Sequence, residues 1–183
     1  MTRLNPEELG RYLGRYEHTL FRMETLPAYA VTSDGDDFNR WLAGEAEPTW
    51  ERKNRWLDVL RTERAAGKVS RRVRVLSEEL TEYERYSCEW GYALNAPAGE
   101  DIRVLRRGEH VIPDAHTEHD WWIVDGREVV LMHYDNDGRF AFAEICPDPH
   151  GDYPDAAWLA WGAAEPFPEW WARHPELHRQ VAV

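Results

Sequence analysis

Hydrophobic and polar positions follow two different spacings along the chain. Over the first 67 residues the apolar positions recur mainly at helical spacing, with Phe38, Trp41 and Leu42 as one example. This pattern predicts three helices, at about residues 5–16, 38–42 and 48–66. Residues 19–27 fit either the end of a helix or a strand.

The spacing changes to that of strands after residue 67. Residues 72–76, Arg-Val-Arg-Val-Leu, alternate with period two, and residues 102–105 form a second short apolar run. A helix is expected between them, because Thr81 followed by Glu84 fits a capping box and apolar side chains recur up to residue 94. This helix should end before Pro97. Strand, helix and strand together predict a parallel β-α-β unit with a right-handed crossover.

Three further strands are predicted after a polar linker. Residues 121–124 and 128–132 flank an Asp-Gly pair, which favours the tight turn of a β-hairpin. A second turn precedes a strand at residues 140–145, and a tryptophan-rich helical segment follows. The strands are apolar on both faces, so helices should cover both. The predicted fold class is α+β: a mixed central sheet in which a parallel β-α-β unit precedes an antiparallel β-meander, with helices on both faces and at both ends.

Length and composition are typical of one cytoplasmic domain. The 183 residues are 43% hydrophobic and 31% charged. We expect a single domain over 1–183, with a helical part, 1–67, packed on a sheet-containing part, 68–183. No apolar run approaches the roughly 20 residues that span a bilayer. The polar N-terminus is unlike a secretory signal, and the two cysteines form no disulfide framework. We therefore expect no membrane association.

Charge is distributed unevenly and bears on the partners. Residues 108–183 carry four lysines and arginines against fifteen aspartates and glutamates, which accounts for almost all of the chain's net charge of −12. Such a surface repels a phosphate backbone, so we expect no direct binding to nucleic acid. A protein partner or a small-molecule ligand is expected instead. Nothing in the sequence indicates an oligomeric state.

The open end of the predicted hairpin contains the candidate catalytic residues, which are His116, Glu118, Asp120 and His133. A two-residue turn at Asp125-Gly126 places Glu118 opposite His133, and a turn displaced by one position places Asp120 there instead. In either case the carboxylates and the imidazole share one face, where they suit acid–base chemistry or a divalent metal. A three-residue loop would instead bring His119 opposite His133. The alternative is that these are polar residues at a solvated strand end.

The same two-residue turn fixes which apolar side chains share a face. It places Trp121, Ile123, Val130 and Met132 on one side of the hairpin. The other side would hold Trp122, Val124, Val129 and Leu131.

Arginines of the β-α-β unit form a second candidate site. Arg72 and Arg74 lie on one side of their strand, and Arg103 lies near the start of the neighbouring strand. Together they suit an anion site, or they form ion pairs within this acidic chain. No phosphate-binding loop, dinucleotide-binding turn, nucleophile elbow or metal-ligand spacing is present, so we expect no cofactor and no metal.

Several stretches resemble a domain-of-unknown-function family that is widespread in actinobacteria. They are LFRMETLPAYAV at 20–31, WLAGE at 41–45, RVRVLSE at 72–78, TEY at 81–83, AGEDIR at 98–103, DWWIVD at 120–125 and MHYD at 132–135. The resemblance covers about residues 18–160. Such proteins are typically encoded beside helix-turn-helix regulators, which implies a regulatory or toxin–antitoxin-like setting. The resemblance implies no particular catalytic residue.

A weaker likeness is to one half of a phospholipase D-like domain, in the order of strands and helix before His119. That chemistry uses a histidine nucleophile, a lysine two residues later and an aspartate five further on. Here Trp121 stands in the lysine position and Asp125 comes one residue early. The likeness therefore implies a site that has lost its chemistry and persists as a binding module.

Together these observations favour a non-enzymatic regulatory or ligand-binding protein that acts with a partner. The alternative is a small metal-assisted or acid–base enzyme with its site at His116, Glu118, Asp120 and His133.

Overall fold

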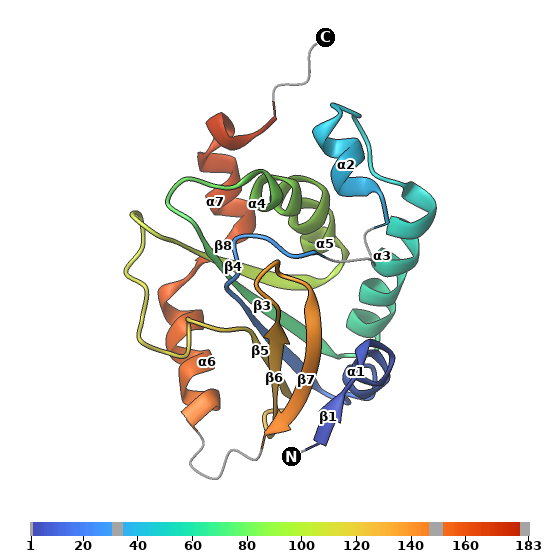
Figure 1. The fold of residues 1–183 in the computed structure, drawn as a ribbon, viewed down its shortest axis with the longest axis vertical. Helices are drawn as coiled ribbons and strands as arrows, with labels where there is room; N and C mark the ends of the chain where they lie inside the picture. Colours follow the sequence, from blue (N-terminus) through green and yellow to red (C-terminus); the bar gives the residue numbers. More distant parts are fainter. Residues whose placement is uncertain (1, 31–34, 147–151, 180–183) are drawn as a thin grey trace.

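One mixed sheet organises the chain in a computed structural model that describes residues 2–30, 35–146 and 152–179 (Figure 1). Within these residues the sheet has eight strands in the order β1-β7-β6-β5-β2-β3-β4-β8. The strands are β1 Thr2–Leu4, β2 Thr19–Glu24, β3 Val69–Leu76, β4 Glu100–Arg106, β5 Trp121–Val124, β6 Glu128–Tyr134, β7 Phe140–Cys146 and β8 Glu165–Pro166. β2, β3 and β4 are parallel, and every other neighbouring pair is antiparallel. The predicted α+β class with a mixed sheet is confirmed.

The predicted β-α-β unit is present. Its connection is a continuous helical segment made of α4 (Glu82–Tyr86), the π-helix η1 (Ser87–Tyr92) and α5 (Ala93–Ala98). The capping box forms as expected: the Thr81 hydroxyl accepts from the Glu84 N–H, and the Glu84 carboxylate accepts from the Thr81 N–H. The expected end before Pro97 is wrong, because the helix includes this residue. It ends at Gly99, whose φ of 130° lies in the region that glycine adopts without strain.

The N-terminal part contributes strands to the sheet as well as helices. The ambiguous stretch 19–27 contains β2, which lies between β5 and β3 near the middle of the sheet. β1 pairs with β7 at one edge. Residues 1–67 are therefore not a purely helical layer on the sheet. Their helices are α1 (Pro6–Leu13), α2 (Asp37–Leu42) and α3 (Trp50–Ala65).

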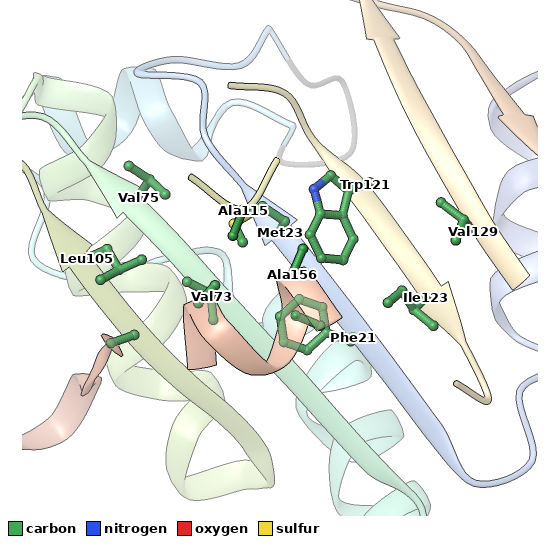
Figure 2. Close-up of a cluster of buried hydrophobic side chains, with 13 residues drawn as sticks. Phe21, Met23, Val73, Val75, Leu105, Ala115, Trp121, Ile123, Val129 and Ala156 are labelled. Carbon is green, nitrogen blue, oxygen red and sulfur yellow. The ribbon is translucent and has the colours of Figure 1, made fainter. Parts of the chain in front are cut away.

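Helices lie on both faces of the sheet, as predicted. One face is covered by α6 (Asp152–Ala163), whose alanines pack on side chains of β2, β3 and β5 (Figure 2). α1 packs on the opposite face of β5, β6 and β7, where Leu9 and Tyr12 meet Val130. The segment from α4 to α5 covers that same opposite face at β3 and β4. There α7 (Phe167–Arg173) and the 3-10 helix η2 (Pro175–Leu177) complete a third hydrophobic cluster.

The hairpin register differs from the predicted one. Trp121 pairs with Leu131 and Val124 with Glu128, so three residues form the loop and not two. Asp125 and Gly126 do adopt positive φ values, 50° and 70°, and the Arg127 N–H donates to the Val124 carbonyl. Arg127 is then an extra residue before pairing begins.

The Asp125 carboxylate explains why the loop is held in this form. It accepts the backbone N–H groups of Glu17, His18 and Thr19 at 2.7–2.9 Å, and its own N–H donates to the Thr19 carbonyl. The loop is therefore fastened to the start of β2. The extra residue shifts β6 by one position and reverses the side to which each of its side chains points.

The predicted division of apolar side chains between the two faces is consequently wrong for β6. Trp121 and Ile123 share their face with Val129 and Leu131, while Trp122 and Val124 share theirs with Val130 and Met132. The alternation within β5 is as predicted.

Candidate functional site

The structure does not bring the four predicted catalytic residues together. Asp120 points to the face covered by α1 and α3, because it directly precedes β5 and alternates with Trp121. His133 points to the opposite face as a result of the three-residue loop. His116 and Glu118 lie in the connection between β4 and β5. Of the four, these two alone are neighbours, and they are joined by His119, which the predicted site did not include.

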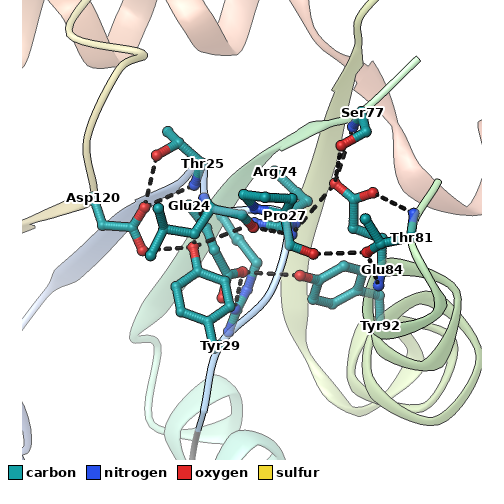
Figure 3. A network of polar contacts seen from close by, with 12 residues as sticks. Glu24, Thr25, Pro27, Tyr29, Arg74, Ser77, Thr81, Glu84, Tyr92 and Asp120 are labelled. Carbon is teal, nitrogen blue, oxygen red and sulfur yellow. Dashed lines mark hydrogen bonds and ion pairs between the residues drawn. The ribbon is translucent and has the colours of Figure 1, made fainter. Parts of the chain in front are cut away.

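Asp120 is buried and fully engaged in hydrogen bonds (Figure 3). Its Oδ1 accepts from the backbone N–H and the hydroxyl of Thr25, at 2.8 and 2.9 Å. Its Oδ2 accepts from the hydroxyls of Tyr29 at 2.6 Å and Tyr134 at 3.2 Å. Four donors around one carboxylate hold the loop after β2 against β5, which is a structural role.

His133 lies at a half-exposed position of β6. Its ring stacks on Phe142 with the centroids 4.3 Å apart, and its Nε2 is 3.7 Å from Glu144. Neither carboxylate of the predicted site contacts it.

The three arginines of the second candidate site are also divided between the faces. Arg72 and Arg74 lie on the same side of β3, as predicted, and both are buried. Arg103 points to the other face, where its guanidinium donates to the Trp161 carbonyl and lies 4.4 Å from the Trp161 ring centroid. The three therefore form no common anion site, and the alternative of ion pairs within the chain holds for Arg72.

Glu24 of β2 is the centre of a buried ion-pair network. It accepts from Arg72 at 2.6 Å and from the Tyr92 hydroxyl at 2.9 Å, and it pairs with Arg22 at 2.9 Å. Arg72 also pairs with Glu100 at 2.7 Å. Burial alone would raise the pKa of Glu24, but the adjacent Arg22 and Arg72 outweigh it and hold this pKa below its usual range. Glu24 is thus a permanent anion between cations.

A second buried network continues from this one along β3 (Figure 3). Arg74 donates to the Leu26 carbonyl at 2.6 Å and to the Tyr29 hydroxyl at 3.3 Å, and it lies 3.7 Å from Glu84. Glu84 in turn accepts the backbone N–H groups of Ser77 and Thr81. The loop after β2 and the start of α4 are therefore held to β3 by polar contacts.

Members of the first network, together with Tyr29, line a cavity of about 470 Å³. β2 and β3 supply the floor, α2 and α3 one side, and the segment from α4 to α5 the other. The lining residues are Arg22, Glu24, Tyr29, Asp37, Arg52, Lys53, Trp56, Arg72, Tyr83, Tyr86, Ser87, Trp90, Gly91, Tyr92 and Asn95. The volume lies within the range of about 300–1,000 Å³ that is typical of small-molecule sites.

Cations outnumber anions in the cavity lining by four to two, in a chain whose net charge is −12. The cations are Arg22, Arg52, Lys53 and Arg72, and the anions are Glu24 and Asp37. Asp37 is already engaged, because it pairs with Arg52 and accepts from Thr49. The Nε of Arg22 is buried and has no hydrogen-bond partner within the described residues.

Tyrosine and tryptophan rings form most of the remaining wall. Tyr86 packs edge-on against Trp90 at 6.0 Å, and Tyr83 packs against Tyr29 at 5.9 Å. Burial and the nearby charge of Glu24 raise the pKa of Tyr29 and of Tyr92, so both hydroxyls stay protonated and act as donors.

The π-helix η1 contributes Ser87, Trp90, Gly91 and Tyr92 to this cavity. A π-helix widens the backbone by one residue per turn, and such segments are frequent at functional sites. A Cβ atom added at Gly91 would meet nothing within 4 Å, so the cavity extends up to the helix backbone there.

The sequence interpretation missed Arg22 and Glu24. They fall in the stretch that fitted either a helix end or a strand, so their side chains could not be assigned to a face. The signal was the alternation of residues 20–24, Leu-Phe-Arg-Met-Glu, which matches that of residues 72–76. Two strands with charged residues at every second position predict a shared charged face when they pair.

Two further observations limit the chemistry. Burial raises the pKa of the Cys88 thiol, which therefore stays protonated and is no nucleophile. Within residues 2–30, 35–146 and 152–179, no helix has the length and apolar character to cross a bilayer.

The model of a family described as a domain of unknown function, DUF6879, matches residues 7–172 of the chain. No curated protein matches the chain.

Proposed function

The chain belongs to the DUF6879 family of domains of unknown function, and from that premise we propose that it is a non-enzymatic ligand-binding protein whose cavity takes a small organic anion with a planar ring. The single observation that carries the proposal is the excess of cations in a ring-lined cavity of an acidic protein. A regulatory role exerted with a partner is part of the same proposal, and it is the setting that the family resemblance implies.

The anion preference follows from the charges that line the cavity. Arg22 and Arg72 share Glu24 on the floor, and Arg72 also pairs with Glu100, which does not line the cavity. Lys53 adds a positive charge from the first turn of α3, where the neighbouring Arg52 is paired with Asp37. Attraction between an anion and such groups is stronger in a recess of the protein than in bulk water.

The preference for a planar ring follows from the aromatic wall. Trp56, Trp90 and Tyr83 present faces and edges of rings to the cavity. Stacking on such rings stabilises planar groups, and it adds to the apolar area that binding removes from water.

The protonation states of the titratable groups in the cavity are consistent with a binding role. Catalysis by general acid or base needs a group whose pKa lies near neutrality. The pKa of Glu24 lies far below that point, and those of Tyr29 and Tyr92 lie far above it. Arginines at the site remain charged at every physiological pH. Groups held in one protonation state recognise charge and do not exchange protons.

Adenosine 5′-monophosphate is a suitable first probe, because it has both a planar ring and an anionic group. Adenosine, which has the ring alone, and inorganic phosphate, which has the anion alone, are the two comparison probes. Calorimetric titration and the thermal midpoint measure binding, since a ligand that binds only the folded state raises the midpoint. We expect the nucleotide to bind more tightly than either half, and no conversion of the nucleotide.

Gly91→Trp tests the location, because the added ring would occupy the cavity. Gly162→Trp is the matched control: Gly162 is also helical with nothing within 4 Å of an added Cβ, but it lies in α6 on the opposite face. We expect binding to be lost in the first variant and kept in the second. Failure of all three probes in the unaltered protein, or equal binding by both variants, would overturn the proposal. Turnover of the nucleotide would overturn its non-enzymatic part.

A further inference from the structure

His116, Glu118 and His119 gather at one point of the connection between β4 and β5. The Glu118 Oε1 lies 3.2 Å from the His119 Nδ1 and 3.9 Å from the His116 Nδ1. One ligand atom from each of the three residues lies within 4.8 Å of the others. Two imidazole nitrogens and a carboxylate oxygen at this spacing suit simultaneous contact with one ion.

Tyr153 of α6 orients both imidazoles. Its ring stacks on His116 with centroids 4.3 Å apart and 13° between the planes, and its hydroxyl lies 3.0 Å from the His119 Nε2. The Nε2 of His119 is thus occupied by the tyrosine while Nδ1 faces Glu118. A hydrogen bond on the distal nitrogen is the usual way in which proteins fix the tautomer and direction of a metal-binding histidine.

The backbone beneath the cluster is also fixed. The Trp121 indole donates to the His116 carbonyl at 2.9 Å, and the Thr117 hydroxyl donates to the Pro113 carbonyl at 3.1 Å. Ala115 and Thr117 are buried, whereas the side chain of His116 between them is partly exposed. His116 has a φ of 52°, an uncommon value for a residue with a side chain. The surrounding contacts therefore fix this uncommon conformation.

A second group of histidine and glutamate side chains differs from the His116, Glu118 and His119 group because an arginine already pairs with its carboxylates. Glu109, His110 and Glu165 also approach within 4.8 Å, but Arg173 pairs with both glutamates, at 3.0 and 2.6 Å. The His110 Nδ1 accepts from a backbone N–H. A cation there would have to displace an arginine. For Glu118, by contrast, the ion-pair partners among the described residues are the two histidines alone.

We propose that His116, Glu118 and His119 form a binding site for a divalent transition metal of the zinc class. Imidazole nitrogens favour Zn²⁺, Co²⁺ and Ni²⁺ over Mg²⁺ and Ca²⁺, which prefer oxygen ligands. Three protein ligands leave one position of a tetrahedral ion for water or for a group from another molecule. The site lies on the α6 side of the sheet and is separate from the cavity beside β2 and β3.

The test is a calorimetric titration with Zn²⁺, together with the visible absorption of Co²⁺ bound in its place, which reports tetrahedral coordination. His119→Gln should lower the Zn²⁺ affinity at least a hundredfold and abolish the Co²⁺ bands. Tyr153→Phe keeps the stacked ring and removes the hydroxyl, so a smaller loss, on the order of tenfold, is expected. His133→Gln and His110→Gln are matched controls that should bind as the unaltered protein does.

Each alternative result contradicts the proposal. Absence of Zn²⁺ binding at millimolar metal by the unaltered protein would overturn it. So would binding that survives His119→Gln or that is lost in His110→Gln. Circular dichroism of each variant verifies that it is folded. Gly91→Trp should leave Zn²⁺ affinity unchanged, which keeps this result independent of the proposed cavity ligand.

Discussion

The two faces of β2 and β3 differ sharply although the same residues form them. Phe21, Met23, Val73 and Val75 point toward α6 and form an apolar core, at the edge of which Arg71 lies over the rings of Trp158 and Trp161. The alternate residues, Arg22, Glu24, Arg72 and Arg74, point toward α3 and α4 and form buried ion pairs beside a cavity. One face therefore relies on burial of apolar area and the other on matched charge.

The difference shows what a buried charged face contributes. Burial of apolar side chains stabilises a fold through a non-directional effect. It requires only that the volumes and shapes of the packed side chains match. A buried ion pair seldom stabilises more than apolar side chains of equal volume would, because desolvation offsets the attraction. The charged face therefore contributes a defined arrangement of charges more than it contributes stability, and the proposed function uses that arrangement to recognise a ligand. The apolar face is sufficiently explained by stability.

The largest effect is expected from Glu24→Gln. The variant leaves Arg22 and Arg72 without the anion that they share, and loss of one partner of a buried pair costs about 3–5 kcal/mol. Chemical denaturation at pH 7 measures this loss. A cost below about 1 kcal/mol would show that water reaches these arginines freely, and the contrast between the faces would then disappear.

The pH dependence of the stability loss in Glu24→Gln is a further test of the contrast between the charged and the apolar face. The pKa of Glu24 is lowered in the folded protein from its ordinary value of 4.5. The contribution of the Glu24 carboxylate to the free energy of unfolding is therefore fully present above about pH 4.5. It is lost as the pH falls toward the pKa of the folded state. The difference between the unaltered protein and Glu24→Gln should be greatest at neutral pH and should shrink in acid.

Met23→Ala tests the neighbouring position on the apolar face. Met23 is fully buried against α6, and its truncation should cost about 3 kcal/mol through lost burial and the remaining cavity. This cost should be the same at pH 7 and pH 4, since no charge is involved. A cost that changes with pH as that of Glu24→Gln does would mean that the two faces are not energetically separate.

Much of the fold could be predicted because local patterns determine it. The β-α-β unit followed from the alternation at residues 72–76 and the capping box at Thr81. The hairpin strands followed from the Asp-Gly pair. Their register did not, because Asp125 binds backbone groups of residues 17–19, more than 100 positions away. Local sequence patterns cannot predict a contact between residues so far apart in the chain.

The candidate sites were less predictable for the same reason. Grouping Asp120 with His133 depended on the loop length, and one extra residue separated them. His116 and Glu118 do lie together, but His119 replaces the other two. The cavity could not be predicted, because it combines β2, α3 and η1, which meet only in the folded chain.

The smallest effect is expected from a pair of substitutions that add carbon atoms to each face and so compare how densely the two faces are packed. Ala160 of α6 is fully buried in the apolar core, so Ala160→Val should overpack it and cost about 1–3 kcal/mol. Gly91 of η1 borders the cavity, where an added Cβ meets nothing within 4 Å. Gly91→Ala should therefore cause no clash and should stabilise the protein by about 0.5–1 kcal/mol, because alanine loses less backbone freedom in a helix than glycine does. Thermal midpoints of the two variants measure both changes, and opposite signs are expected. If Gly91→Ala destabilises as much as Ala160→Val, the charged face is packed as closely as the apolar one, and its cavity is too small to admit a ligand.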